Sequence, residues 1–209
     1  MTHTLNATRR LLAGGARPPV ELVAIGASAG GVAALLTLLS PLPANYALPI
    51  VAVLHLLPRR QSQLGSVLAH RLALPVREAQ DKEPIEPGHI YLASANYHLL
   101  VELDRTFSFS SEPPVSFARP SIDVLMDSAA DAYGPALAGV LLTGANMDGA
   151  EGMAAIKSQG GLTVVQQPQD ADVATMPQAA IDRCSPDHVM PLREIQQMLL
   201  RLGETGGVA

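Results

Sequence analysis

The sequence predicts an α/β fold: a doubly wound, mainly parallel sheet with helices on both faces and a small antiparallel hairpin. Long, mostly apolar runs favour a parallel sheet that is covered on both sides, and they lie at about 21–25, 49–55 and 136–143. A segment of helical character follows each run, at 31–40, 61–72 and 150–158. Two short segments joined by Leu103-Asp104-Arg105 are typical of a hairpin, at 97–102 and 106–110.

In chain order, the first strand leads through a glycine-rich turn into the helix 31–40, which Ser40-Pro-Leu-Pro43 stops. The helix 61–72 is predicted because Leu64, Leu68 and Leu72 recur at intervals of four residues. Shorter strands are expected near 76–79, 89–93 and 98–103, with a Pro/Gly-marked loop over 81–88 and another loop over 111–117.

The second half opens with a helix after Arg119-Pro-Ser121, with Ser121 as its N-cap. Asp123, Asp127 and Asp131 share one face of this helix, which we interpret as a solvated acidic face, with a ligand site as the alternative. The strand 136–143 and the helix 150–158 follow. We then expect a turn and strand at 160–166, a helix at 177–183, a short strand at 188–190 and a helix at 191–202.

Length and composition indicate one globular domain over 20–203, with a flexible tail at 1–19 and a frayed end at 204–209. A net charge of −5 argues against nucleic acid as a partner. The single cysteine, Cys184, cannot form an internal disulfide and fits a reducing compartment. No apolar run approaches the roughly 18 residues of a membrane span. The N-terminus does not resemble a signal peptide, so we expect a cytoplasmic protein.

The turn Gly26-Ala-Ser28-Ala-Gly30-Gly31 allows three interpretations. It satisfies the G-x-S-x-G pattern of a nucleophile elbow, which exposes a serine beside a helix N-terminus. It also fits the outer glycines of a dinucleotide fingerprint, or it is a tight turn that needs glycine for packing. The fingerprint is disfavoured because Ser28 replaces its middle glycine and the second strand ends in His55 rather than an acidic residue.

Ser28, His55 and Asp148 each end or follow a long apolar strand, so a parallel sheet brings them to one edge. These residue types form an acyl-transfer site, in which histidine takes the serine proton and the carboxylate orients the imidazole. Their chain order differs from that of α/β-hydrolases. The alternatives are a structural histidine and an aspartate that caps the following helix. None of the histidines at 70, 89, 98 and 188 closes a long central strand. The chemistry requires no metal or cofactor.

The sequence resembles the catalytic domain of the CheB protein-glutamate methylesterases of chemotaxis from Val23 to about Leu202. The resemblance rests on segments in a fixed order: 24–31, 54–58, 87–91, 119–125, 142–144 with 148–153, and 176–177. It implies hydrolysis of glutamate methyl esters on methyl-accepting chemoreceptors with release of methanol, and in many members deamidation of receptor glutamines. It implies Ser28 as nucleophile, His55 as general base and Asp148 as the orienting carboxylate.

The resemblance also implies substrate-side roles. The Ala29 N–H is expected in the oxyanion hole, with a second donor from the Gly144–Met147 turn. Ala145 stands where the family often has methionine, and Ala29 where it often has threonine. The basic residues Arg59, Arg60 and Arg119 are candidates for docking an acidic receptor, with ordinary solvated arginines as the alternative.

Many relatives carry an N-terminal receiver domain, for which the roughly 20 residues before the first strand are too few. We therefore expect either no regulation within the chain or control by a separate protein. A non-catalytic signalling adaptor on the same fold is the alternative function.

Overall fold

The computed structural model describes residues 17–55 and 58–204, although not the side chains of 58–63. The predicted tail 1–19 and frayed end 204–209 lie mostly outside this range, as do the side chains of Arg59 and Arg60. Arg17 is anchored rather than free: it donates to the carbonyls of Gly160 and Gly161 and pairs with Asp187 at 3.2 Å.

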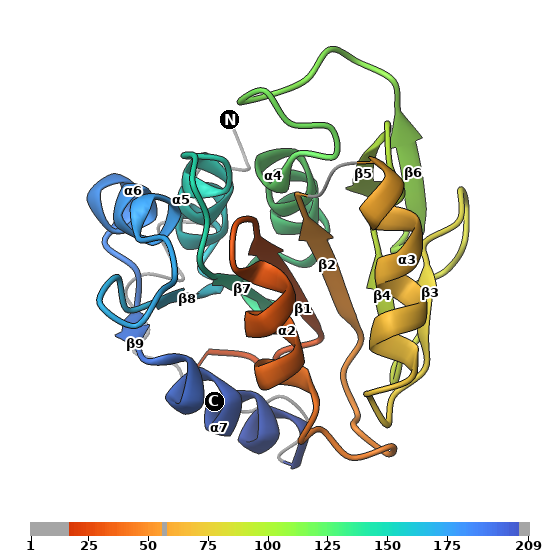
Figure 1. The fold of residues 1–209 in the computed structure, drawn as a ribbon, viewed down its shortest axis with the longest axis horizontal. Helices are drawn as coiled ribbons and strands as arrows, with labels where there is room; N and C mark the ends of the chain where they lie inside the picture. Colours follow the sequence, from red (N-terminus) through yellow and green to blue (C-terminus); the bar gives the residue numbers. More distant parts are fainter. Residues whose placement is uncertain (1–16, 56–57, 205–209) are drawn as a thin grey trace, which may run out of the picture.

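A seven-stranded parallel sheet forms the centre of the molecule, in the order β3-β4-β2-β1-β7-β8-β9 (Figure 1). Its strands are β1 (Leu22–Ala27), β2 (Ile50–Leu54), β3 (Val76–Glu78), β4 (Ile90–Leu92), β7 (Leu137–Leu141), β8 (Leu162–Gln166) and β9 (His188–Met190). A separate antiparallel hairpin consists of β5 (His98–Val101) and β6 (Phe107–Ser110). The predicted fold class is confirmed.

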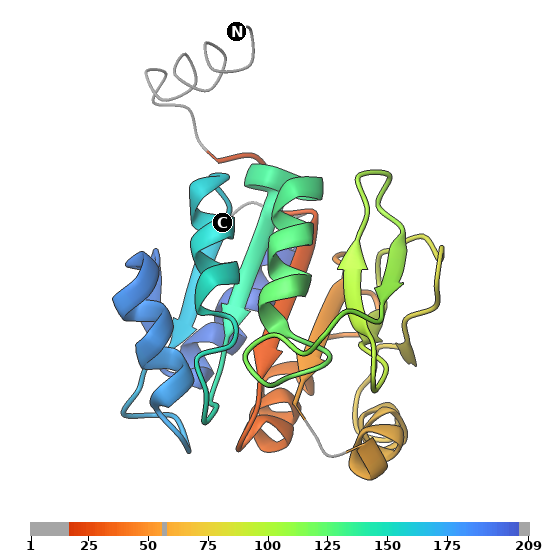
Figure 2. The same ribbon diagram turned by 90° about the horizontal axis from the view of Figure 1, so that it is seen from above.

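Helices cover both faces of the sheet (Figures 1 and 2). On one face, α2 (Gly31–Leu39), α3 (Pro58–Ala69) and α7 (Leu192–Glu204) enclose one apolar core. On the other, α4 (Ile122–Tyr133), α5 (Ala150–Ser158), α6 (Thr175–Cys184) and the hairpin enclose a second. The short 3-10 helix η1 (Gly134–Ala136) leads from α4 into β7.

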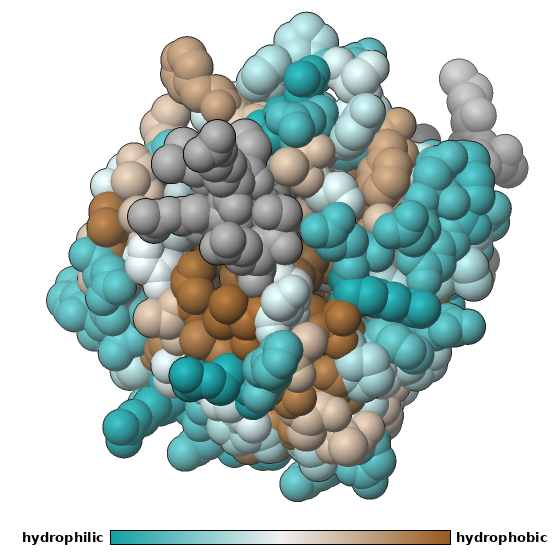
Figure 3. All heavy atoms as spheres, turned by 45° about the vertical axis from the view of Figure 1, so that its right-hand side comes forward, coloured by the Kyte–Doolittle hydropathy of each residue, from teal (hydrophilic) through white to brown (hydrophobic). Residues whose placement is uncertain are grey.

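The central strands are apolar throughout because alternate side chains enter different cores. In β1, Val23 and Ile25 belong to the α2 side, whereas Leu22 and Ala24 belong to the α4 side. Figure 3 shows part of the α2 and α3 surface, where apolar side chains (brown) gather below the grey atoms among mostly polar neighbours.

The helix predicted at 61–72 runs from Pro58 to Ala69 instead. Proline is compatible with the first helical position because its missing N–H would have no intrahelical acceptor there. Leu72 continues the apolar period but lies beyond the helix, and it packs in the same core. The periodicity therefore located the buried face and misplaced the ends by three residues.

The chain leaves β1 toward α2 on one face and leaves β7 toward α5 on the other. Since these neighbouring strands send their connections in opposite directions, a crevice is expected beyond their carboxyl ends. Ser28 follows β1, and Asp148 follows β7 after the loop that starts at Leu142.

Candidate active site

Ser28 occupies the sharp turn between β1 and α2. Its N–H donates to the Thr143 carbonyl at 2.9 Å, and its own carbonyl accepts from the Gly31 N–H at 2.8 Å. Gly30 adopts a left-handed conformation with φ 79°, and a Cβ there would lie 2.5 Å from a carboxylate oxygen of Asp172. Only glycine fits this position without strain, so the turn that presents Ser28 depends on it.

The sheet register brings His55 beside Ser28. Ala27 pairs with Leu54 across the parallel β1 and β2 strands, and the His55 N–H donates to the Ala27 carbonyl at 3.1 Å. The next residue along β1 is Ser28. The serine and the histidine therefore leave the sheet on neighbouring strands at the same edge.

Asp148 lies against His55, with 2.8 Å between Asp148 Oδ2 and His55 Nε2. The Asp148 side chain is completely buried, and 14% of the His55 side chain is exposed. The contact is short, but the Nε2–H direction is poorly aligned for a hydrogen bond. Such contacts often tighten only when substrate is bound. Because Nε2 faces the carboxylate, Nδ1 is the ring nitrogen that points away from this contact.

Asp148 also accepts three hydrogen bonds from the start of α4. Oδ1 accepts from the Ser121 hydroxyl at 2.7 Å and from the Asp123 N–H at 3.0 Å. Oδ2 accepts from the Ile122 N–H at 2.7 Å. The alternative in which Asp148 caps its own following helix is wrong, because the N-cap of α5 is Gly149 and the Asp148 carboxylate caps α4.

These contacts keep Asp148 ionised. Burial alone would raise the pKa of this carboxyl, but the close contact with His55 and the hydrogen bonds from Ile122, Asp123 and Ser121 outweigh it and lower the pKa. A carboxylate is also favoured by the partial positive charge at a helix N-terminus. Asp148 is thus fixed in the charged form that stabilises an imidazolium.

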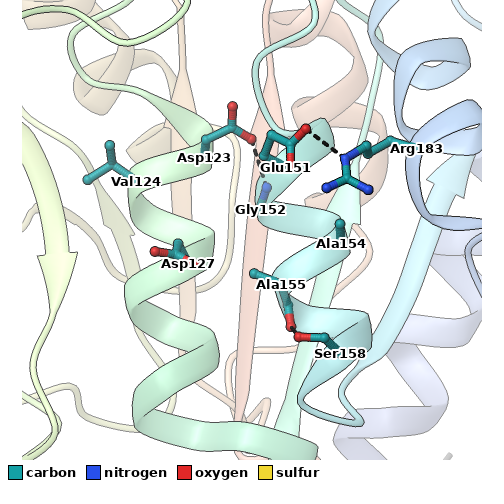
Figure 4. Close-up of a pocket in the computed structure, with 9 residues that line it drawn as sticks. All are labelled: Asp123, Val124, Asp127, Glu151, Gly152, Ala154, Ala155, Ser158 and Arg183. Atoms are coloured by element: carbon teal, nitrogen blue, oxygen red, sulfur yellow. Dashed lines mark hydrogen bonds and ion pairs between the residues drawn. The ribbon is translucent and has the colours of Figure 1, made fainter.

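Asp123 is partly buried and caps α5, so the interpretation of all three aspartates as one solvated face is wrong for this residue. Its Oδ1 accepts from the N–H groups of Gly149 and Gly152, both at 2.8 Å. Figure 4 shows the bond from Gly152. The two helices therefore exchange caps, since Asp148 from the α5 side caps α4. Asp127 and Asp131 are exposed, as predicted.

Burial, together with the neighbouring charge of Asp148, raises the pKa of Asp123 to about 6. The unfolded chain holds such a carboxyl at a pKa of about 3.9. The folded protein therefore binds this proton more tightly, and the free energy of unfolding should fall as pH rises from about 4 to about 7. Asp148, with its lowered pKa, acts in the opposite direction and below about pH 4.

The Asp123→Asn substitution should abolish the decrease in the free energy of unfolding between about pH 4 and pH 7. The amide oxygen can still accept hydrogen bonds from both N–H groups, and no charge is buried. Relative to the unmodified protein, the variant should gain stability between pH 4.5 and pH 7 in urea denaturation. Asp127→Asn, one turn further along the exposed face, is the matched control and should leave the pH profile unchanged. Parallel profiles for the Asp123→Asn variant and the unmodified protein would contradict the assignment.

Sequence reasoning missed His98, which is 1% exposed. Its Nδ1 accepts from the Ser121 N–H at 3.2 Å, so Nε2 carries the proton and donates to the Pro113 carbonyl at 3.2 Å. Ser121 was predicted only as an N-cap, which the Val124 N–H to Ser121 Oγ bond confirms. The motif Arg119-Pro-Ser121-Ile-Asp123 was visible in the sequence, but its contacts with Asp148 were not.

Thr143 was also missed. Its hydroxyl donates to the Ala29 carbonyl at 2.8 Å and accepts from the Val173 N–H at 2.9 Å, which ties the serine turn to the loop before α6. Among the described residues the Ala29 N–H has no acceptor, so it remains available to an oxyanion.

The predicted substrate-side residues lie near this edge, but their roles stay predictions. Ala145 is exposed in the turn before Asp148. The Gly144 N–H is taken by the Val173 carbonyl at 3.1 Å, which removes it from the candidates for a second oxyanion donor. Arg119 Nη1 donates to the carbonyls of Ser111 and Glu112 at 2.8 and 3.0 Å, so this guanidinium organises its own loop.

A groove of about 570 Å³ lies between α4, α5 and α6, and Ser28 is not one of its lining residues (Figure 4). Small residues of α5 form its floor, and the Glu151–Arg183 ion pair at 2.7 Å crosses its rim. Within residues 17–55 and 58–204, no group of three or more His, Cys, Asp or Glu side chains is arranged to hold a metal ion. Across the same residues, every helix is too short or too polar to cross a membrane.

Comparison with known proteins gives consistent matches. The family model described as CheB methylesterase matches residues 23–199. A Leptospira interrogans relative, named putative protein-glutamate methylesterase/protein-glutamine glutaminase, is 46% identical over 184 residues, covering 88% of this chain and 95% of the relative. A Pseudomonas aeruginosa relative with the corresponding name is 39% identical over 92% of this chain, which spans 56% of that relative.

The crystal structure of the Thermotoga maritima CheB methylesterase catalytic domain matches with a TM-score of 0.83 and 31% identity, covering 88% of this chain and all of that domain. The chain thus has a doubly wound α/β fold with its candidate site at the carboxyl ends of the parallel strands, and this fold is the one found in a methylesterase catalytic domain. The chain belongs to the CheB methylesterase family.

Proposed function

We propose that this chain is a protein-glutamate methylesterase that hydrolyses glutamate methyl esters on chemoreceptors. The observation that carries the proposal is the buried Asp148, 2.8 Å from His55, at the same sheet edge as the Ser28 turn. The names of the relatives point to the same reaction and not to an adaptor. A carboxylate kept ionised against a histidine beside a serine serves acyl transfer.

In the proposed reaction, Ser28 Oγ bonds to the ester carbonyl carbon while its proton passes to His55 Nδ1. The imidazolium that forms is stabilised by Asp148 through Nε2. Collapse of the tetrahedral intermediate breaks the carbon–methoxy bond, and the His55 proton leaves with the methoxy oxygen as methanol. Water then attacks the acyl-enzyme with His55 again as base, which returns glutamate and free Ser28.

The oxyanion needs donors that are already in place. The Ala29 N–H is one candidate, because it lies in the serine turn and has no acceptor among the described residues. With Gly144 already engaged, the remaining candidates in the second turn are the N–H groups of Ala145, Asn146 and Met147.

Deamidation of receptor glutamines by the same machinery would release ammonia in place of methanol, as the names of the relatives suggest. We place the reaction in the cytoplasm, which suits a protein with one free thiol, Cys184. We also propose control by a separate protein. This proposal is supported by the Leptospira relatives, 95% of whose length this chain covers.

The direct test is methanol release from membranes that carry methylated chemoreceptors. Release is expected with methylated membranes and not with membranes left unmethylated. Absence of release from both, together with no hydrolysis of a small glutamate methyl ester, would contradict the proposed function and favour the adaptor.

A further inference from the structure

The loop between β6 and α4 contains a tight two-residue turn at Ser116 and Phe117. Val115 and Ala118 exchange both backbone hydrogen bonds, at 3.1 and 2.8 Å. Ser116 and Phe117 have φ angles of 50° and 64°. Turns of this type favour asparagine and glycine, and a bulky side chain at positive φ is unusual. Such strain is often kept where it serves binding.

Phe117 is fully exposed at this tip. Val115, in the same turn, is 38% exposed, and Met147, in the turn before Asp148, is 67% exposed. The two turns are joined, because Asn146 Nδ2 donates to the Ser116 carbonyl at 3.4 Å. Three of the exposed large apolar side chains of the described residues thus come from two adjoining turns. Packing within the protein does not account for these three apolar side chains, because each is exposed.

The loop that carries Phe117 is braced along its length. His98 Nε2 donates a hydrogen bond to the Pro113 carbonyl, and Arg119 donates to the carbonyls of Ser111 and Glu112. His98 also holds the N–H of Ser121, whose hydroxyl donates to Asp148. The loop therefore keeps a fixed position relative to Asp148, which lowers the entropy cost of using its tip for binding.

Figure 1 shows this loop passing from β6 to α4 over the end of the sheet at which β2 terminates. A protein segment whose glutamyl ester reaches Ser28 must cross the same end of the sheet. An apolar contact suits this chain, because its net charge of −5 opposes docking of an acidic protein by charge alone.

We propose that Phe117, together with Val115 and Met147, contacts an apolar side chain of the receptor segment beside the esterified glutamate. The contact selects protein esters over free ones. This inference rests on the proposed function, and it concerns substrate choice rather than the chemical step.

The test compares two substrates with the Phe117→Asn variant. Asparagine tolerates positive φ, so the turn should be preserved while the ring is lost. KM for methylated receptor membranes should rise about tenfold, as is common when an aromatic contact is removed from an interface. Hydrolysis of N-acetylglutamate γ-methyl ester, which has no flanking residues, should stay unchanged.

Leu103→Asn is the matched control, because Leu103 is 78% exposed at the opposite end of the β5–β6 hairpin. The Leu103→Asn variant should leave both the KM for receptor membranes and the hydrolysis of the free ester unchanged. An unchanged KM of the Phe117→Asn variant for receptor membranes would overturn the inference. If KM were unchanged and only the sedimentation coefficient of the variant differed from that of the unmodified protein, Phe117 would serve self-association instead. Failure of the proposed function is distinguishable, because the unmodified protein would then hydrolyse neither ester.

Discussion

Replacing Ser28 by alanine is expected to lower methanol release from methylated receptors by about 10⁴-fold or more, as in other enzymes whose nucleophile acts with a histidine and a carboxylate. The reason is chemical, because no other group in the serine turn can form an acyl-enzyme. The turn itself should persist, since it is held by the Ser28 backbone through Thr143 and Gly31.

Ser158→Ala is the matched control, because Ser158 is exposed at the far end of α5. It should retain full activity. Both proteins should unfold at the same urea concentration as the unmodified chain. Full activity of the Ser28→Ala variant would show that Gly26–Gly31 is a packing turn and that the nucleophile lies elsewhere.

Replacing Asp148 by asparagine should lower kcat by about 10⁴-fold, because the amide neither fixes the histidine tautomer nor stabilises the imidazolium. It should also destabilise the fold. Both carboxylate oxygens accept from α4, so an amide nitrogen in either place faces an N–H or hydroxyl donor. One buried donor left without an acceptor costs about 1–3 kcal/mol.

Ser121→Ala separates the two effects. It removes one donor to Asp148 and the N-cap of α4, which costs about 1 kcal/mol, but it leaves the carboxylate beside His55. Its stability should fall while most of the activity remains. If Ser121→Ala and Asp148→Asn lost activity equally, the positioning of α4, and not the charge of Asp148, would govern the reaction.

Local sequence patterns were enough to predict the fold class and the edge of the sheet at which the candidate site lies. Strands that are apolar on both faces, such as 22–25, are typical of a parallel sheet that is covered on both sides. Parallel strands end at a common edge, so Ser28, His55 and Asp148 could be expected together before any contact was known. These inferences depend on local patterns and on the handedness of crossovers, which hold across many sequences.

The contacts of Asp148 and Asp123 could not be predicted from these patterns and are known from the three-dimensional packing. Asp148 and its partners at the start of α4, Ser121 included, are 25 to 27 residues apart in the chain. Asp123 lies at the same four-residue interval as the exposed Asp127 and Asp131, so the spacing does not distinguish it from them. Periodicity assigns a residue to a face of its own helix, but it does not say which helix end packs against that face. The exchange of caps between α4 and α5, the bracing by His98 and the exposed position of Phe117 depend on packing between distant segments.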